Sequence, residues 1–519
     1  MATNDTKLAT ADSDSGQFHS DDEKRVGEQR EHTGHEAAAR LFDMPADPDA
    51  HLSEAERKKI DRKLLWKLDL KLIPWLCLLY LASFLDRTNI GNAKLLTLTK
   101  DLNMPKDSQY SAALSIFFVS YSLFEPLTNI MLKRFRPSIF IPIIMVLWGI
   151  SMTFMGFCKN WSGLMAARFF LGLCEAGLFP GVNYYLSCWY RRSEFGIRAA
   201  IFFSAAAVSG SFGGLLAAAI GKMDGLGGFA GWSWIFILEG IATTLAGVAS
   251  FWLVHDFPDN ATFLTEQDRA RVIRRLKMDK QASAGKEDFS MVYFWQSVKD
   301  WKTWTGAVVY MGADGALYAF SLFLPSIISQ LGYTATTAQL LTVPPYAAAA
   351  VLTISVGFIA DRTHQRGLCN IGVSLIGAAG FIMLLASSNP HVQYAGTFLG
   401  AMGIYPCIPN TISWASNNFE GVYKRGVSLG IIIGWGNLNG IMSSNVYRTA
   451  DAPRYQPGHG VVLAYLSLFL LGGSILQYLL LRSENSKRRA GKRDHWIEGK
   501  TGSEIDLMGD QRPDFIYTL

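Results

Sequence analysis

Apolar stretches of about 20 residues recur along most of this 519-residue chain, and short polar loops separate them. A tilted helix of that length crosses the hydrocarbon core of a bilayer. The pattern therefore predicts about twelve membrane-spanning helices. They are expected near residues 72–92, 110–132, 139–157, 163–187, 199–221, 234–254, 304–329, 340–360, 368–386, 394–416, 427–447 and 461–481.

A long polar segment divides these spans into two sets of six, and the predicted fold class is an all-α polytopic membrane protein. Within the segment, DRARVIRRLK at 268–277 has the basic amphipathic pattern of a short surface helix. We expect a disordered cytosolic tail and basic pre-helix at 1–63, an N-terminal six-helix bundle at 64–255, a cytosolic linker at 256–303, a C-terminal six-helix bundle at 304–481 and a cytosolic tail at 482–519.

Composition agrees with a membrane protein, because only 18% of the residues are charged and 50% are hydrophobic. Average soluble domains carry about 25% charge. Basic residues gather in alternate loops, and the positive-inside rule then puts both termini in the cytosol. We expect the plasma membrane as the location. The residues that set this orientation are Lys133, Arg134, Arg136, Arg191, Arg192, Arg362, Arg366, Lys424 and Arg425.

Several classes of chemistry lack their sequence signal in this chain. It has no glycine-rich loop ending in Gly-Lys-Ser/Thr, no cysteine–histidine cluster and no nucleophile elbow. We therefore expect no ATP-driven transport, no metal, no cofactor and no enzyme activity. The expected partners are the lipid bilayer, a small substrate and protons, with no nucleic acid, and the expected state is a monomer.

Charged residues inside the apolar spans are the strongest functional signal. Arg87 lies in LIPWLCLLYLASFLDRTNIG at 72–91, and Arg168 and Glu175 lie in another span. A charge at the centre of a membrane helix costs about 2.5–3.5 kcal/mol on insertion scales, so such residues mark substrate or ion pathways. The chain is predicted to move a charged molecule across a membrane.

Short motifs carry a resemblance to a known family over most of the chain. They are FLDRTNIGNAK at 84–94, RFFLGLCEAGLFPG at 168–181, WYRRSE at 189–194, WASNN at 414–418 and APRYQPG at 452–458. Together they resemble the fungal allantoate permease family of anion:cation symporters, a branch of the major facilitator superfamily. The resemblance implies proton-coupled import of a small organic anion, such as nicotinate or an allantoate-like compound.

The loop GFIADR at 357–362 is similar to the signature loop of that superfamily. A small residue lets two helices approach closely, and an Asp and an Arg can fasten a gate. We therefore expect Asp361 and Arg362 to form a latch on the cytosolic side.

The charged residues suggest a binding site. Arg87 and Arg168 are expected to bind the anion and Glu175 to carry the proton, with Glu125 as a second proton site. Arg168 and Glu175 are seven residues apart and about 10 Å apart along one helix face. In the proposed switch, ionised Glu175 pairs with Arg168, and protonation releases this arginine for the substrate. Polar residues expected to line the cavity and bind substrate include Asn183, Tyr318, Trp414 and Asn437.

The chain is also similar to the vesicular glutamate and sialic acid transporters. Those relatives carry another arginine where this chain has Asp314. The departure argues against a dicarboxylate substrate. Three alternatives remain open from the sequence. The chain could export a secondary metabolite, it could be a nutrient sensor that does not transport, or its buried charges could only hold helices together.

Overall fold

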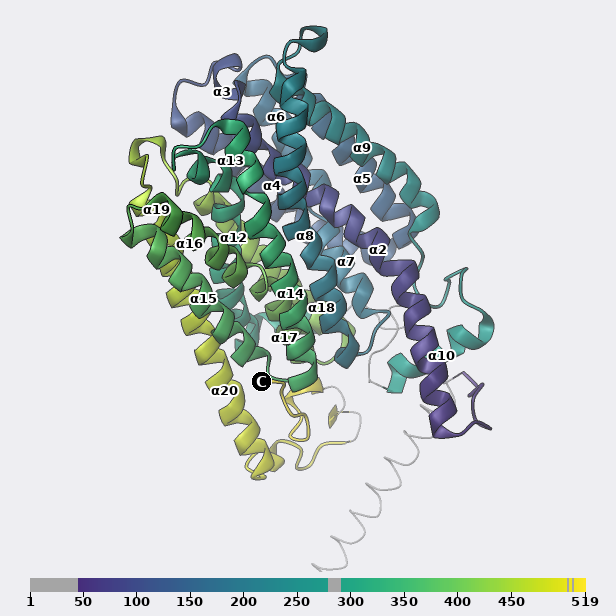
Figure 1. The fold of residues 1–519 in the computed structure, drawn as a ribbon. Helices are drawn as coiled ribbons and strands as arrows, with labels where there is room; N and C mark the ends of the chain where they lie inside the picture. The colour runs from purple at the N-terminus through teal and green to yellow at the C-terminus, as the bar shows by residue number, and fades with distance from the viewer. Residues whose placement is uncertain (1–44, 279–290, 502–503, 506–507) are drawn as a thin grey trace, which may run out of the picture.

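The computed structural model describes residues 45–278, 291–501, 504–505 and 508–519, and these residues form helices and no strands (Figure 1). The larger part of the expected tail at 1–63 lies outside the described residues. The helices run side by side in one elongated bundle, and the two ends of the bundle differ (Figure 1). We call the end where α2 begins and α20 ends the terminal end.

The first half of the chain starts with a long capped helix. Ser53 and Glu56 form a reciprocal capping box, in which the Ser53 amide donates to Glu56 Oε2 at 3.0 Å. Helix α2 therefore begins before the first apolar span and continues through it. The elements of this half are α2 (Glu54–Leu95), α3 (Leu98–Asp101), α4 (Asp107–Arg134), α5 (Pro137–Met155), α6 (Trp161–Glu175), α7 (Leu178–Ser187), α8 (Arg192–Ile220), η1 (Gly221–Met223), η2 (Leu226–Gly228) and α9 (Gly231–Leu253).

Two short helices, α10 (Glu266–Met278) and α11 (Met291–Lys299), lie between the halves. Helix α10 occupies the basic amphipathic pattern and binds the N-terminal bundle at the terminal end, where Arg275 Nη2 donates to Glu194 Oε1 at 2.5 Å. The elements of the second half are α12 (Trp301–Ser329), α13 (Ala335–Leu341), α14 (Val343–Thr363), α15 (Arg366–Ala386), α16 (Pro390–Ile404), α17 (Cys407–Asn417), α18 (Val422–Ser443), η3 (Thr449–Asp451), α19 (Gln456–Ala464), η4 (Tyr465–Gly472), α20 (Gly473–Arg489), η5 (Asp494–Trp496) and η6 (Gly509–Gln511).

Ten helical stretches of the described residues are long and apolar enough to cross a membrane. The sequence predicted about twelve, and the two others fall on α16 with α17 and on α18. Helices α16 and α17 are separate short helices, interrupted at Pro406, which lacks an amide hydrogen. Helix α18 has enough length but is more polar, since Asn437 and Asn439 lie in it.

The two bundles contact one another through α2 with α12, α4 with α18, and α8 with α14. Near the end opposite the terminal end, α2 crosses α12 at Gly91. A Cβ at Gly91 would lie 2.5 Å from the backbone oxygen of Leu322, closer than atoms can approach. The crossing of the two halves at this point therefore requires glycine.

Replacing Gly91 by alanine is expected to lower transport about tenfold, since overpacking of this kind costs about 1–3 kcal/mol. The added methyl meets backbone rather than a movable side chain, so α2 must shift away from α12. Uptake per surface-expressed molecule measures the effect. Gly430→Ala is the matched control, because nothing lies within 4 Å of a Cβ at this α18 glycine. Equal uptake by both variants would contradict the prediction.

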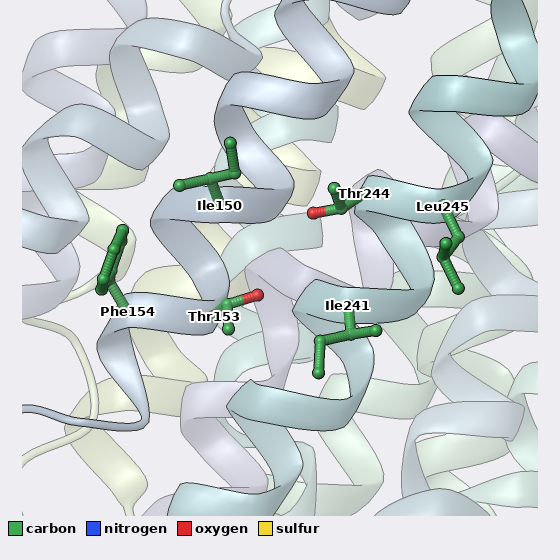
Figure 2. A pocket seen from close by; sticks show the side chains of 6 residues that line it. All are labelled: Ile150, Thr153, Phe154, Ile241, Thr244 and Leu245. Atoms are coloured by element: carbon green, nitrogen blue, oxygen red, sulfur yellow. The ribbon is translucent and has the colours of Figure 1, made fainter.

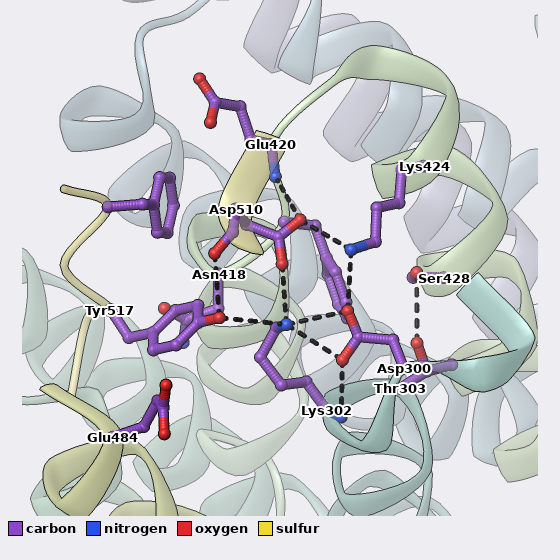
Figure 3. A network of polar contacts seen from close by, with 12 residues as sticks. Asp300, Lys302, Thr303, Asn418, Glu420, Lys424, Ser428, Glu484, Asp510 and Tyr517 are labelled. Atoms are coloured by element: carbon purple, nitrogen blue, oxygen red, sulfur yellow. Dashed lines mark hydrogen bonds and ion pairs between the residues drawn. The ribbon is translucent and has the colours of Figure 1, made fainter. Parts of the chain in front are cut away.

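Residues 508–519 fold back onto the C-terminal bundle, and we call this segment the C-terminal clasp. The sequence predicted a cytosolic tail at 482–519, whereas α20 extends to Arg489 and the clasp is packed against protein. The Lys302 and Lys424 ammonium groups lie between the carboxylates of Asp300 and Asp510, with N–O distances of 2.7 to 2.8 Å (Figure 3). Two positive and two negative charges thus balance inside a buried cluster.

The pKa of one carboxyl in this cluster, that of Asp300, is lowered. Burial alone would raise the pKa of the Asp300 carboxyl, but Lys302 and Lys424 outweigh burial and hold the pKa below its ordinary value of 3.8. A carboxyl with a lowered pKa stabilises the folded state above the ordinary value and loses that contribution as pH falls through the lowered one. The contribution of Asp300 to stability is therefore expected to be lost only in strong acid.

Asp510→Asn is expected to lower the free energy of unfolding by about 2 kcal/mol, because the two buried lysines then share a single carboxylate. The midpoint of thermal unfolding of the purified protein measures the loss. Asp514→Asn is the control in the same segment, since the Asp514 side chain is 71% exposed. A midpoint unchanged by Asp510→Asn would show that the clasp contributes nothing to stability.

Candidate functional site

The centre of the site is a buried ion pair within the N-terminal bundle. Every residue from Ser83 to Ala93 of α2 is buried, so this stretch is enclosed by other helices. Arg87 Nη2 donates to Glu175 Oε1 of α6 at 2.6 Å, and the two side chains are 3% and 0% exposed. Ser83, one helical turn before Arg87, donates to the same oxygen at 2.5 Å.

A chain of hydrogen bonds, which we call the relay, extends this ion pair into the C-terminal bundle. Arg87 Nη1 donates to the Tyr318 hydroxyl of α12 at 2.5 Å, and that hydroxyl donates to Asn437 Oδ1 of α18 at 2.9 Å. Asn437 Nδ2 in turn donates to Glu125 Oε2 of α4 at 2.9 Å. The relay therefore runs from Glu175 to Glu125 and crosses between the two bundles twice.

Aromatic rings surround the Arg87 guanidinium on several sides. Its central carbon lies 4.9 Å from the ring centre of Tyr121, 5.2 Å from that of Phe117 and 5.4 Å from that of Tyr318. An arginine over an aromatic face is attracted by the ring electrons, the more so in a site shielded from water. The rings thus stabilise the positive charge of Arg87, in addition to its one carboxylate partner, Glu175.

Arg168 lies beside one ring of the same aromatic group, that of Phe117. Its guanidinium is 5.2 Å from the Phe117 ring centre, and its Nε donates to the Ala113 backbone oxygen at 3.3 Å. Glu175 is paired with Arg87, so the pairing of Glu175 with Arg168 expected from the sequence is absent from this structure. The reason is geometric: residues seven apart are separated by about 10 Å along the helix, whereas the Arg87 side chain of α2 reaches Glu175 at the end of α6.

Several polar atoms of the site make no hydrogen bond to the part of the chain that the structure describes. They are Arg87 Nε, Arg168 Nη1, Glu175 Oε2, Glu125 Oε1 and Asp314 Oδ2. Buried polar atoms are usually paired, and unpaired ones often mark binding or proton-transfer sites. The unpaired atoms here include both donors and acceptors, which suits a polar ligand.

Two residues predicted from the sequence lie apart from the relay. Asn183 of α7 donates to the Phe179 oxygen of its own helix at 2.9 Å. Trp414 of α17 donates to the Thr518 oxygen at 2.9 Å, so the clasp covers it. Neither of these bonds joins the relay, because each side chain faces another part of the bundle.

The predicted gate residues are only partly brought together. Asp361 Oδ2 accepts from the Ile197 amide at the start of α8 at 2.6 Å, and this bond joins the two bundles at the terminal end. Asp361 also forms a short ion pair with Arg366, whereas Arg362 is exposed. The arginine that pairs with Asp361 is thus Arg366, because α14 ends at Thr363 and the chain turns back before α15.

Asp86, the residue before Arg87, has partners of its own. Asp86 Oδ2 accepts from Trp148 Nε1 and from Thr243 Oγ1, each at 2.9 Å. These bonds join α2 to α5 and α9. Asp86 therefore connects helices within the N-terminal bundle, while its neighbour Arg87 faces the relay.

Sequence reasoning missed Ser83, and it named Arg366 without predicting its pairing with Asp361. The spacing of four residues between Ser83 and Arg87 is a signal for a shared helix face.

Across residues 45–278, 291–501, 504–505 and 508–519, no group of three or more metal-ligating side chains could hold an ion.

A groove between α5 and α9 lies apart from the relay (Figure 2). Its volume is about 290 Å³, and it is lined by Ile150, Thr153, Phe154, Ile241, Thr244 and Leu245. Phe154 and Leu245 are exposed on the outer surface of the bundle. A groove with this apolar lining and no charged group fits lipid chains rather than a polar substrate.

Comparison with known proteins finds transporters that match this chain over most of its length. A transporter of Schizosaccharomyces pombe, described as uncharacterized, is 37% identical over 90% of this chain and 90% of its own length. The high-affinity nicotinic acid transporter of Saccharomyces cerevisiae is 33% identical over 88% of this chain and 85% of its own length. The MFS-type transporter cnsO of Penicillium expansum is 36% identical over 90% of this chain and 93% of its own length.

Solved structures share the fold. A bacterial homolog of the human lysosomal transporter Spinster, in an inward-facing and occupied conformation, has a TM-score of 0.57 and 16% identity. The match covers 83% of this chain and 98% of the bacterial chain. The sequence profile of the Major Facilitator Superfamily matches residues 76–444, most of both bundles. This chain, with its two helical bundles and its relay of buried polar residues between them, belongs to the Major Facilitator Superfamily.

Proposed function

We propose that this transporter imports a small organic anion together with protons, as a monomer in the plasma membrane with both termini in the cytosol. We further assign it to the allantoate permease branch of its superfamily. The observation that carries the proposal is the buried ion pair of Arg87 and Glu175, which is bonded to Tyr318 of the other bundle. In this scheme residues 64–255 and 304–481 are the two moving bundles.

The ion pair couples a proton to an anion through charge balance. While Glu175 is ionised, it is the counter-ion of Arg87. A proton on Glu175 removes that negative charge, and a buried arginine without a counter-ion is costly. A substrate carboxylate then takes the place of the Glu175 carboxylate at Arg87. Proton and anion thus favour binding together, and Arg168 adds a second positive charge nearby.

The relay gives this exchange a structural consequence. Arg87 holds Tyr318, and through Tyr318 it holds Asn437 of the C-terminal bundle. A substrate bound to Arg87 competes for the same donors and so changes the contact between the bundles. In transporters with two repeated halves, rocking of the halves around a central site gives alternating access. Opening at the terminal end must also break the bond from Ile197 to Asp361.

The relative named as a high-affinity nicotinic acid transporter supports a carboxylate vitamin as the substrate. The test is uptake of radiolabelled carboxylate vitamins and ureides into permease-deleted yeast at acidic and neutral pH. We expect one compound to accumulate faster in acid and a protonophore to collapse its gradient. Protein at the cell surface with no uptake of any compound would overturn import and favour efflux.

A further inference from the structure

Asp314 is a buried carboxylate that the exchange at Arg87 does not use. It lies on α12, one helical turn before Tyr318, and so on the same face of that helix. Its side chain is 1% exposed. Asp314 Oδ2 has no hydrogen-bond partner among the residues that the structure describes. A side chain of this kind in a membrane helix is costly unless something pairs with it.

The surroundings of Asp314 place it beside the relay. At Gly436 of α18, a Cβ would lie 3.2 Å from Asp314 Oδ2 and 2.3 Å from the Tyr310 ring, so Asp314 packs directly against α18. The next residue of α18 is Asn437, which is bonded to Tyr318 and Glu125. Asp314 is therefore a neighbour of the relay where the relay passes through the C-terminal bundle, at Tyr318 and Asn437.

The site consequently has two poles. At one pole, the guanidinium groups of Arg87 and Arg168 each lie 5.2 Å from the centre of the Phe117 ring. At the other pole, Glu125 of α4 and Asp314 of α12 lie against α18 near Gly434 and Gly436, and each has an oxygen without a hydrogen-bond partner in the described part of the chain. Arginines attract a carboxylate, and the acidic pole repels a second one. A ligand that satisfies both poles is asymmetric.

We propose that Asp314 is a specificity-determining residue of this site, and that it recognises a nitrogen of the substrate away from the carboxylate. The proposal rests on the proposed anion transport and adds the second half of the substrate. Ionised Asp314 accepts a hydrogen bond from an N–H group, and protonated Asp314 donates one to an unprotonated ring nitrogen. A carbon atom in place of the substrate nitrogen can form a hydrogen bond with neither ionised nor protonated Asp314. Heterocyclic and ureide carboxylates meet this requirement, while plain carboxylates and dicarboxylates do not.

The test uses ligand pairs that differ only in nitrogen, with binding to the purified full-length protein measured by competition. Pyridine-3-carboxylate is paired with benzoate, and N-carbamoylglycine with 4-oxopentanoate. We expect the nitrogen member of at least one pair to bind about tenfold or more tightly than its carbon analogue. In Asp314→Ala this preference should fall below about threefold, with the affinity of the carbon analogue unchanged.

Two further variants separate recognition from folding. Asp314→Asn keeps a group that both donates and accepts, so it is expected to retain part of the preference. Glu239→Ala is the matched control, because Glu239 of α9 is buried and its oxygens also lack hydrogen-bond partners among the described residues. It should retain the full preference. Equal binding of both members of each pair, or a preference that survives Asp314→Ala, would overturn the proposal.

Pyridine-3-carboxamide distinguishes this proposal from the anion-transport proposal on which it rests. The carboxamide keeps the ring nitrogen and lacks the carboxylate. If the carboxylates bind without regard to nitrogen, anion recognition stands and the role of Asp314 is wrong. If the carboxamide binds as tightly as the carboxylate, the role of Arg87 as an anion anchor is wrong. Binding of neither carboxylate nor carboxamide overturns both.

Discussion

Arg87→Ala is expected to lower uptake of the anion by about 100-fold or more while leaving the protein at the cell surface. A charge-assisted hydrogen bond is worth up to about 3 kcal/mol, which corresponds to roughly 100-fold in affinity. Arg87 supplies two such donors, to Glu175 and Tyr318, and its loss also separates the relay into two parts. Initial uptake rates, corrected for surface protein, measure the effect.

The control for this variant is Arg362→Ala, which removes an arginine that is exposed near the terminal end. It should transport at nearly the wild-type rate. Arg87→Lys is a second comparison, since lysine keeps the charge but lacks the planar fork that contacts two partners at once. Normal uptake by Arg87→Ala would remove Arg87 as the substrate anchor.

Glu175→Gln is expected to abolish proton-driven accumulation and to flatten the pH dependence of uptake. Glutamine is close in size to glutamate but carries no charge and binds no proton, so Arg87 is left permanently available to the anion. Exchange of internal for external substrate requires no net proton movement and should partly survive. Accumulation and exchange are measured in the same vesicles, with and without a pH gradient.

Glu125→Gln is the matched variant at the other end of the relay. If Glu175→Gln still accumulates substrate against a gradient and Glu125→Gln does not, the proton site is Glu125. If both variants accumulate substrate, neither relay carboxylate carries the coupled proton.

Much of the fold was predictable, because the thickness of the bilayer sets the length of the apolar stretches that cross it. The residues of the ion pair were also predictable, since Arg87 and Glu175 are charges in apolar spans. Their mutual pairing was not, because spacing along one helix suggested Arg168 for Glu175. Which side chains meet depends on packing across the whole bundle, and here Arg87 of α2 reaches Glu175 at the end of α6.

Local rules failed where the chain turns back or folds over itself. Arg362 follows Asp361 directly, yet the turn after α14 brings Arg366 to that carboxylate. Trp414 looked like a cavity residue, but Thr518, more than 100 residues away, accepts its indole hydrogen. The clasp has no apolar periodicity, and buried charges that neutralise one another leave no such pattern in a sequence.

The clasp also bears on how the protein is made. Lys302 and Asp510 are 208 positions apart in sequence, and the ribosome completes the first long before the second. Until residues 508–519 emerge, Lys302 and Lys424 have Asp300 as their shared carboxylate. A nascent chain, or one shortened by a premature stop codon, thus has an uncompensated positive charge at the terminal end of the bundle. This uncompensated charge is a chemical difference between an unfinished and a finished transporter, and cellular quality control can recognise it.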